Sequence, residues 1–197
     1  MSKVVKQTND VFISEADQYV FGQGTHYEIY KKLGAHMCTH DGKDGVFFAV
    51  WAPNAQDVYV IGEFNGWNET ANKMERIGEG GIYTTFIENV SEGQMYKYLI
   101  ELADGRKLYK ADPYANYAEL RPGTASRVYD LNHFEWNDSK WMTAREKKDM
   151  NKEPLAIYEC HIGSWMKHPD GTEDGFYTYR QFADRMIEYL KDMPYTH

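Results

Sequence analysis

Short runs of β-branched and aromatic residues recur along the middle of this 197-residue chain, and turn-forming pairs separate them. Runs of this length, bounded by turn residues, are typical of β-strands. Asp41-Gly42, Asn65-Gly66 and Asp104-Gly105 favour tight hairpins, because glycine adopts a positive φ without steric cost. The pattern therefore predicts a mainly β fold, an antiparallel β-sandwich of about 100 residues. The runs are GVFFAVW (45–51), DVYVIGEF (57–64), GIYTTFIENV (81–90), QMYKYLIEL (94–102) and SRVYDL (126–131).

The positions of these runs set the expected domain boundaries. Residues 1–34 form an N-terminal lead-in, and residues 35–132 hold the sandwich. The polar and charged stretch 133–153 is expected to be a linker, and residues 154–197 form a separate C-terminal segment.

The C-terminal segment has the pattern of one strand followed by one helix. AIYECHIGSW (156–165) is short and apolar, which predicts a buried strand. Thr178 and Gln181 have capping-box spacing, and apolar residues then repeat at helical intervals as far as about residue 191. Because a βα unit needs parallel partner strands, we expect residues 154–197 to begin an α/β domain that this chain does not finish.

The three adjacent residues Glu159, Cys160 and His161 raise the question of a catalytic site. Successive side chains on a strand point to opposite faces, so Cys160 and His161 diverge. A thiolate and its base must instead lie within roughly 3 Å of each other. The geometry therefore argues against a Cys-His dyad formed by these neighbours.

The net charge of −8 disfavours nucleic acid and anionic membrane surfaces as partners. The N-terminus lacks the apolar core of a signal peptide, and no apolar run is long enough to span a membrane. Cys38 and Cys160 form no disulfide framework, so we expect a cytoplasmic protein. Aromatic residues make up 15% of the chain, and exposed rings suit a neutral, hydroxyl-rich ligand such as a sugar.

Five segments follow one another along the chain: GTHYEIYKKLGAH (24–36), GVFFAVWAPNA (45–55), GEFNGWN (62–68), YKADPYA (109–115) and IYECHIGSW (157–165). In this order they resemble the N-terminal region of the 1,4-α-glucan branching enzymes, the glycogen-building members of the α-amylase family. The resemblance extends over residues 19–197 and implies a family-48 carbohydrate-binding module with an immunoglobulin-like sandwich. The start of a (β/α)₈ barrel follows, with residues 156–165 as its first strand and Thr178 to Lys191 as its first helix.

The resemblance implies a retaining transfer of an α-1,4-glucan segment to a 6-hydroxyl, without metal or other cofactor. Its aspartate nucleophile and glutamate acid/base, expected about 5 Å apart, come from later barrel strands. Glu159 matches neither residue, so no catalytic residue is assigned within this chain, and the chain alone is expected to be inactive. A complete barrel needs about 250 residues, and the rest of it is therefore an expected partner.

Trp67 and Lys97 are the candidate glucan-binding residues, because they match sugar-contacting positions of glycogen-binding modules. Alternatively, Trp67 is a core ring beside a hairpin, and Lys97 is an ordinary solvated lysine. Such modules carry a second Trp after the Asp-Gly hairpin, whereas this chain has Lys107 or Leu108 near that position. Two alternatives to the branching enzyme therefore remain, a stand-alone α-glucan-binding module and an immunoglobulin-like interaction module without sugar affinity.

Two further groups of residues could have functional roles. His161 and Trp165 are candidates for facing the substrate cleft of a complete barrel, because barrel active sites gather at strand C-termini. His36, Cys38 and His40 share one face of an extended strand and are ligand types that zinc accepts. No fourth ligand is evident for them, so we predict no metal site.

Overall fold

The computed structural model describes residues 11–167 and 175–197. Within these ranges no helix combines the length and apolar character that a membrane crossing requires. The helices are α1 (Glu15–Gly22), α2 (Ser139–Glu146), α3 (Ile162–Trp165) and α4 (Tyr179–Leu190), and the short 3₁₀ helices are η1 (Ile29–Lys31), η2 (Glu63–Asn65) and η3 (Leu131–His133). The strands are β1 (Gly34–His40), β2 (Lys43–Trp51), β3 (Asp57–Gly62), β4 (Glu75–Ile77), β5 (Ile82–Glu88), β6 (Met95–Glu101), β7 (Lys107–Lys110), β8 (Tyr117–Ala118) and β9 (Ser126–Arg127).

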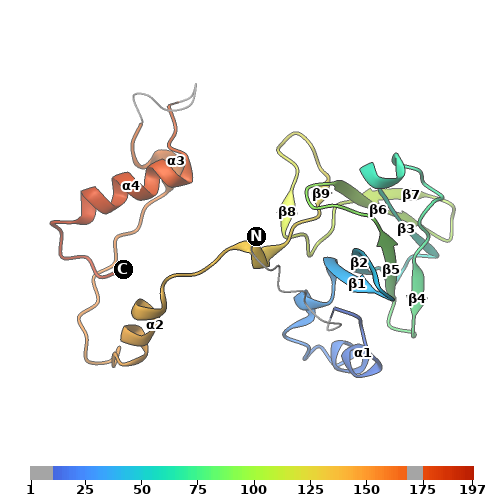
Figure 1. The fold of residues 1–197 in the computed structure, drawn as a ribbon, viewed down its shortest axis with the longest axis horizontal. Helices are drawn as coiled ribbons and strands as arrows, with labels where there is room; N and C mark the ends of the chain where they lie inside the picture. The colour runs from blue at the N-terminus through green and yellow to red at the C-terminus, as the bar shows by residue number, and fades with distance from the viewer. Residues whose placement is uncertain (1–10, 168–174) are drawn as a thin grey trace. The chain divides into compact units, whose positions relative to one another are not determined.

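All of these strands belong to two antiparallel sheets, as Figure 1 shows. Sheet A has the order β1-β2-β5-β4, and sheet B has the order β3-β6-β9-β8 with β7 also paired to β6. The predicted Asp41-Gly42 hairpin joins β1 to β2, with φ values of 49° and 79° at its two turn residues. The prediction of a mainly β, antiparallel fold is therefore confirmed.

The main core lies between the two sheets and is built by the inward-facing residues that alternate along their strands. Phe48 of β2 is fully buried, and its ring centroid lies 5.1 Å from that of Tyr96 on β6. Burial of these apolar faces is the main force that holds the sheets together. The core residues include Ala35, Val46, Phe48, Val50, Val58, Val60, Tyr83, Tyr96, Tyr98 and Val128.

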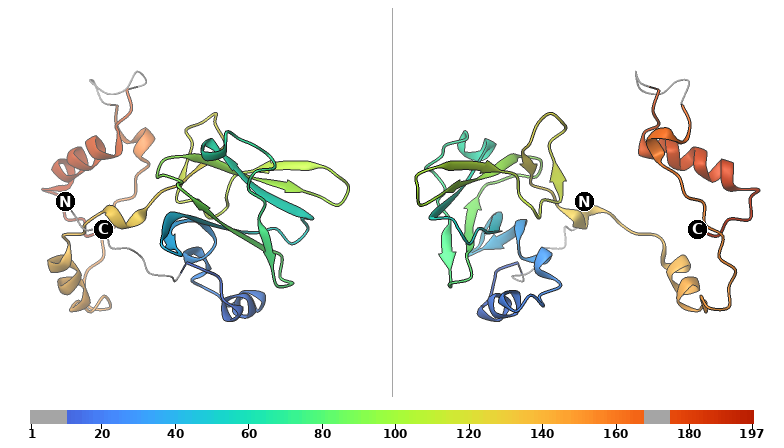
Figure 2. Two further views of the ribbon diagram at one scale, coloured as in Figure 1. Left: turned by 45° about the vertical axis from the view of Figure 1, so that its right-hand side comes forward. Right: turned by 180° about the vertical axis from the view of Figure 1, so that it is seen from behind.

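A second apolar cluster covers the opposite face of sheet A. Phe47 and Ala49 of β2 pack there against Ile29 and Leu33 of the lead-in. Figures 1 and 2 show the lead-in, drawn in blue, on this side of sheet A. Because β2 is buried on both faces, its sequence is continuously apolar rather than alternating.

The lead-in is fixed by a capped helix and a partly buried ionic group. The Ser14 hydroxyl accepts a hydrogen bond from the Asp17 N–H, and the Asp17 carboxylate accepts one from the Ser14 N–H, which forms a capping box at the start of α1. Asp17 also lies 2.9 Å from His26 Nε2 and 3.7 Å from Lys32 Nζ. Burial opposes ionisation of Asp17, but the hydrogen bonds from Ser14 and His26 and the charge of Lys32 outweigh it and lower its pKa to about 2.

Acid is expected to weaken this anchor. Because the pKa of Asp17 is about 2 in the fold and 3.8 ordinarily, its contribution is present above pH 3.8 and is lost as the pH falls through 2. We expect Asp17→Asn to lower the free energy of unfolding by about 1 kcal/mol above that window, allowing for solvent screening. Denaturant titrations of both proteins between pH 2 and pH 3.8 and above check this expectation. A difference in the free energy of unfolding between Asp17→Asn and the unmodified chain that is the same at both ends of this range would contradict it.

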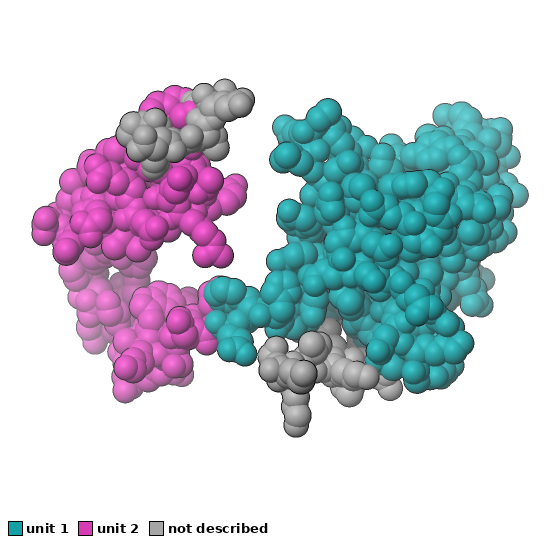
Figure 3. Space-filling model, turned by 45° about the horizontal axis from the view of Figure 1, so that its top comes forward, with its two compact units in different colours: residues 1–135 teal, residues 136–197 magenta. Residues whose placement is uncertain are grey.

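The chain divides into two compact units, residues 1–135 and residues 136–197, which are coloured separately in Figure 3. The second unit contains α2, α3 and α4. Its α4 begins at the predicted capping box, where the Thr178 hydroxyl accepts from the Gln181 N–H. The helix α2 lies within the stretch 133–153 that was predicted to be a linker.

The predicted buried strand over 156–165 is not formed in the structure. Residues 154–160 have no regular secondary structure, Ile157 is 63% exposed, and α3 begins at Ile162. A strand needs a hydrogen-bonded neighbour, and here the only segment that pairs with it, among the described residues, is Thr196-His197. The strand prediction was therefore wrong for this chain.

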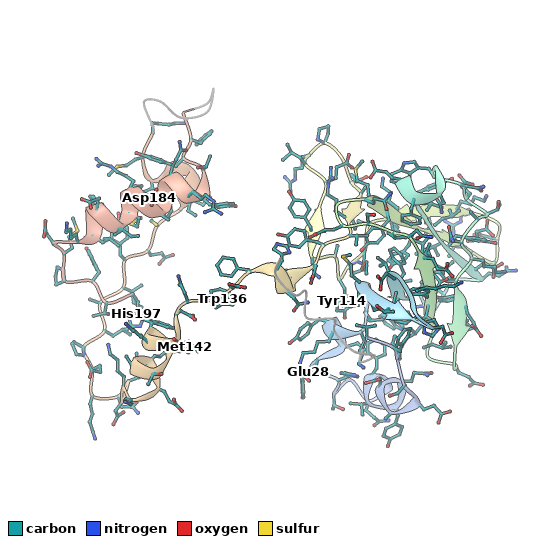
Figure 4. The ribbon with its side chains drawn as sticks, in the orientation of Figure 1. Glu28, Tyr114, Trp136, Met142, Asp184 and His197 are labelled. Carbon is teal, nitrogen blue, oxygen red and sulfur yellow. The ribbon has the colours of Figure 1, made fainter. Side chains whose placement is uncertain are left out.

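The pairing of this segment with the last two residues has the pattern of parallel strands. The His197 N–H donates to the Ala156 carbonyl over 3.1 Å, and the Tyr158 N–H donates to the His197 carbonyl over 2.8 Å. His197 thus bonds to both neighbours of Ile157, which is the hydrogen-bond pattern of a parallel strand pair. Figure 4 labels His197 in this segment and Asp184 on α4.

Candidate functional site

An open hollow of about 440 Å³ lies against sheet B. Its walls come from β3, β6, β7, the loop that follows β3 and the loop between β8 and β9, and they carry aromatic, charged and apolar side chains. The neighbours of Lys97 on β6, Tyr96 and Tyr98, belong to the core, so Lys97 points to the outer face of the sheet. The residues that line the hollow are Ile61, Trp67, Glu69, Met95, Lys97, Tyr109, Glu119 and Ala125.

Trp67 occupies an unusual backbone position at this hollow. Gly66 and Trp67 both have left-handed conformations, with φ values of 62° and 60°, and the Trp67 N–H donates to the Gly62 carbonyl over 2.8 Å. A side chain in this conformation costs about 1–2 kcal/mol. Strain of this kind is concentrated at functional sites, and the ring is 38% exposed rather than buried in the core.

The turn before Trp67 is not the hairpin that Asn65-Gly66 predicted. The Asn65 side chain accepts from the Gly62 N–H over 3.0 Å and donates to the Val60 carbonyl over 2.9 Å. These bonds cap the short helix η2, so the chain makes a wider connection here instead of a two-residue turn. It returns antiparallel along β3 only at residues 72–74, where the Val60 N–H donates to the Asn72 carbonyl and the Met74 N–H donates to the Val58 carbonyl. The hairpin prediction failed because the Asn65 side chain bonds to the strand that it follows.

Lys97 is held at the rim of the hollow by a hydrogen bond. Its Nζ donates to the Thr124 hydroxyl over 2.7 Å, in the loop that precedes β9. The ammonium group retains further donors, because a lysine carries three N–H bonds. Trp67 and Lys97, which the sequence singled out separately, therefore line one hollow; their contact with a ligand stays a prediction.

Tyr109 is a site residue that the sequence analysis missed. It lies on β7, lines the hollow and is 49% exposed. Lys107 and Tyr109 are two residues apart, so they share one face of the strand, whereas Leu108 faces the other way. Neither Lys107 nor Leu108, the positions considered for the second ring, is a Trp. Because Tyr109 shares the strand face of Lys107, strand alternation identifies Tyr109 as the aromatic residue on that face.

Glu69 connects the Trp67 loop to β7. Its carboxylate accepts a hydrogen bond from the Tyr109 hydroxyl and pairs with Lys107 Nζ at 2.9 Å. The Tyr109 hydroxyl, followed by the Lys107 ammonium, lowers the pKa of Glu69, and the same carboxylate raises the pKa of Tyr109. Lys107 is also 3.3 Å from Glu101 on β6. The carboxylate therefore stays ionised and the phenol stays protonated near neutral pH.

The chemistry of the hollow suits binding of a neutral polyol. Ring faces of Trp67 and Tyr109 can stack on the apolar C–H surface of a sugar, and Lys97 can donate to its hydroxyls. The two carboxylates in the lining have protein partners, since Glu119 accepts from the Ala125 N–H over 3.0 Å. In the part of the chain that the structure describes, no group of three or more His, Cys, Asp and Glu side chains is placed to hold a metal ion.

His36, Cys38 and His40 do share one face of β1, as the strand pattern predicted, but that face is used for packing. His36 Nε2 lies 2.9 Å from the Leu33 carbonyl, and burial lowers the pKa of His36. Cys38 is buried, which raises the pKa of its thiol. The His40 ring lies 4.9 Å from that of Phe12. The three residues thus help to seat the lead-in on sheet A.

The remaining candidates lie in the second unit. His161 precedes α3 and is exposed, with Nδ1 3.3 Å from the Ser164 hydroxyl. Trp165 donates its indole N–H to the Tyr158 hydroxyl over 2.8 Å and contacts the rings of Phe182 and Tyr189 on α4 at 5.4 and 5.3 Å. Trp165 therefore packs against α4, and its role in a substrate cleft stays a prediction.

The sequence is similar to a family of carbohydrate-binding modules and to bacterial branching enzymes. Residues 32–115 match the family model of Carbohydrate-binding module 48 (Isoamylase N-terminal domain). The chain is 70% identical over 187 residues to the 1,4-alpha-glucan branching enzyme GlgB of Butyrivibrio fibrisolvens and 48% identical over 188 residues to that of Halothermothrix orenii. Each match covers 95% of this chain but only 29% of the enzyme's length.

A similarity in fold also appears among solved structures. A Salmonella typhimurium protein assigned as an alpha amylase superposes with a TM-score of 0.57 over 83% of this chain and 23% of its own. The sequences are 24% identical, so this likeness bears on the fold alone.

Proposed function

We propose that this chain, which corresponds to the N-terminal region of the 1,4-α-glucan branching enzymes and carries a family-48 carbohydrate-binding module, binds α-1,4-glucan in the hollow on sheet B. The observation that carries the proposal is the presence of two exposed rings, Trp67 and Tyr109, in one hollow with a lysine. A glucan chain offers apolar ring faces to the aromatic residues and hydroxyls to Lys97.

The same correspondence supports a proposal for the whole enzyme. It would cleave an α-1,4 link, hold the glucan covalently and transfer it to a 6-hydroxyl, which forms an α-1,6 branch in glycogen. Its two catalytic carboxylates would lie about 5 Å apart on barrel strands outside this chain. This chain alone would then be inactive as a transferase and would contribute binding and scaffold. We place the enzyme in the cytoplasm, in line with the free cysteines Cys38 and Cys160 of this chain.

The domain arrangement is part of this proposal. An immunoglobulin-like module over residues 35–132 follows the lead-in 1–34, and residues 154–197 after the linker supply the first βα unit of a (β/α)₈ barrel. The parallel hydrogen bonds between Ala156–Tyr158 and the last residues support the unit, because a barrel strand pairs in parallel with the strand that follows its helix. The remaining strands of the barrel would extend this ladder and bury the exposed Ile157.

Calorimetric titration with a linear maltooligosaccharide tests the glucan site. Trp67→Ala removes one stacking ring, and we expect binding to weaken at least about tenfold, equivalent to about 1.4 kcal/mol. Trp141→Ala is the matched control, since that ring is 60% exposed in the second unit and is expected to leave the affinity unchanged. Absence of binding by the unmodified chain would favour the interaction module without sugar affinity.

A further inference from the structure

Glu69 makes a brace between two parts of the hollow that are distant in sequence. It follows Trp67 on the loop after β3, while its partners Lys107 and Tyr109 lie on β7, about 40 residues further along. One carboxylate oxygen accepts from the Tyr109 hydroxyl and the other pairs with the Lys107 ammonium at 2.9 Å. The same side chain therefore reaches both the loop of the first ring and the strand of the second.

The second ring needs such a constraint. Tyr109 is half-exposed on β7, a strand of four residues, so packing alone leaves its side chain free to change rotamer. A ring that stacks on a sugar must hold one orientation, and ordering a free side chain on binding weakens affinity by about two- to tenfold. A hydrogen bond at the phenol end fixes the ring while leaving its faces open.

The partners of Glu69 also favour this geometry chemically. A hydrogen bond from a phenol to a carboxylate is charge-assisted and stronger than one between neutral groups. Lys107, which also pairs with Glu101 at 3.3 Å, places a positive charge beside the Glu69 carboxylate. Because Lys107 and Tyr109 share one face of β7, a single carboxylate can contact both.

We propose that Glu69 is a positioning residue, which holds the Tyr109 ring beside Trp67 so that two successive glucose units of an α-glucan meet two oriented rings. The inference rests on the proposed glucan binding and extends it to a residue that acts through Tyr109. Glu69 would not itself supply the stacking surface. Its removal should therefore matter only while the Tyr109 hydroxyl is present.

A double-mutant cycle on the 197-residue chain tests this dependence. Glu69→Gln and Tyr109→Phe should each weaken binding of a linear maltooligosaccharide about two- to tenfold in calorimetry. The double variant should bind like Tyr109→Phe, within about twofold, because Glu69→Gln weakens the charge-assisted hydrogen bond that Tyr109→Phe has already removed. Tyr109→Ala, which removes the ring itself, should bind more weakly than Tyr109→Phe.

Glu88→Gln is the matched control for charge and surface effects. Glu88 pairs with Lys43 at 2.7 Å on sheet A and is similarly exposed, but it does not line the hollow. This variant should bind like the unmodified chain. Losses that add up in the Glu69→Gln/Tyr109→Phe double variant would overturn the inference, as would unchanged binding by Glu69→Gln.

A readout without sugar separates this inference from the glucan proposal. In the unliganded chain, Glu69→Gln should move the ¹³C signal of Tyr109 Cζ toward that of an unconstrained tyrosine, while Glu88→Gln should not. An unchanged signal would overturn the brace even if glucan binds. A shifted signal in a chain that binds no maltooligosaccharide would support the brace but contradict the proposed function and the role in binding.

Discussion

Replacing Phe48 with alanine is expected to lower the free energy of unfolding of the sandwich by about 3–5 kcal/mol. Phe48 is fully buried between the sheets, with its ring centroid 5.1 Å from Tyr96 and 5.8 Å from Phe64. Truncation removes the buried ring and leaves a cavity that two hydrogen-bonded sheets cannot collapse to fill. Denaturant titration followed by near-ultraviolet circular dichroism measures the loss.

Tyr27→Ala is the matched control for Phe48→Ala, because the Tyr27 side chain is an aromatic ring of similar size that is 86% exposed. Its removal should change the free energy of unfolding by no more than about 0.5 kcal/mol. If both variants lost similar amounts, or if Phe48→Ala lost less than about 1 kcal/mol, Phe48 would not be the centre of the core.

Replacing Asp112 with alanine is expected to have an effect of about 3 kcal/mol, for a different reason. Asp112 is buried after β7, and its carboxylate accepts from the Tyr96 hydroxyl over 2.6 Å and from the Tyr114 N–H over 2.8 Å. Its own N–H donates to the Ser126 hydroxyl over 2.8 Å. The sequence analysis identified this segment only as part of YKADPYA; in the fold it joins β6, β9 and Tyr114.

The cost arises from donors that lose their acceptor. Without the carboxylate, the buried Tyr96 hydroxyl and the Tyr114 N–H are left unsatisfied, at about 1–3 kcal/mol for each buried group. Tyr96 cannot compensate by ionising, because its burial, which the variant leaves in place, raises the pKa of its hydroxyl. Asp104→Ala, at an exposed carboxylate, is the control and should cost no more than about 0.5 kcal/mol.

The conservative variant Asp112→Asn separates the charge from the hydrogen bonds. Burial raises the pKa of Asp112 above its ordinary value of 3.8, although the hydrogen bonds from Tyr96 and Tyr114 oppose the rise. The neutral acid is thus favoured in the fold, so its stabilisation is present below pH 3.8 and is lost as the pH rises through the raised pKa. The free energy of unfolding of the unmodified chain, measured relative to that of Asp112→Asn, should therefore fall from acid to neutral pH. A rise over this range would contradict the raised pKa of Asp112.

Much of the β architecture could be predicted because its signals are local. The continuous apolar run in β2 and the Asp41-Gly42 turn act within a few residues, and both appear where expected. The tight Asn65-Gly66 hairpin failed, because the Asn65 side chain accepts from the Gly62 N–H and donates to the Val60 carbonyl, and the chain returns along β3 only at residues 72–74. No pattern in the lead-in revealed that it would cover the outer face of sheet A.

The candidate site was predicted only in part for a related reason. Trp67 and Lys97 were each identified from the sequence alone. Their position in one hollow with Tyr109, however, depends on the pairing of β6 with β3 on one side and with β7 on the other. Glu69 contacts Tyr109 across 40 positions of sequence. The sequence says little about such a pair, because the contact exists only when the register of the strands is set.

The sequence by itself determined the long strands β2, β3, β5 and β6, the start of α4 and which side chains alternate along each strand face, since backbone preference and side-chain period are local properties. Tertiary structure alone decided which ring completes the hollow, which aspartate is buried and whether residues 154–160 form a strand. Each of these depends on partners that are far away in the chain. A strand in particular forms only when neighbouring backbone satisfies its N–H and carbonyl groups.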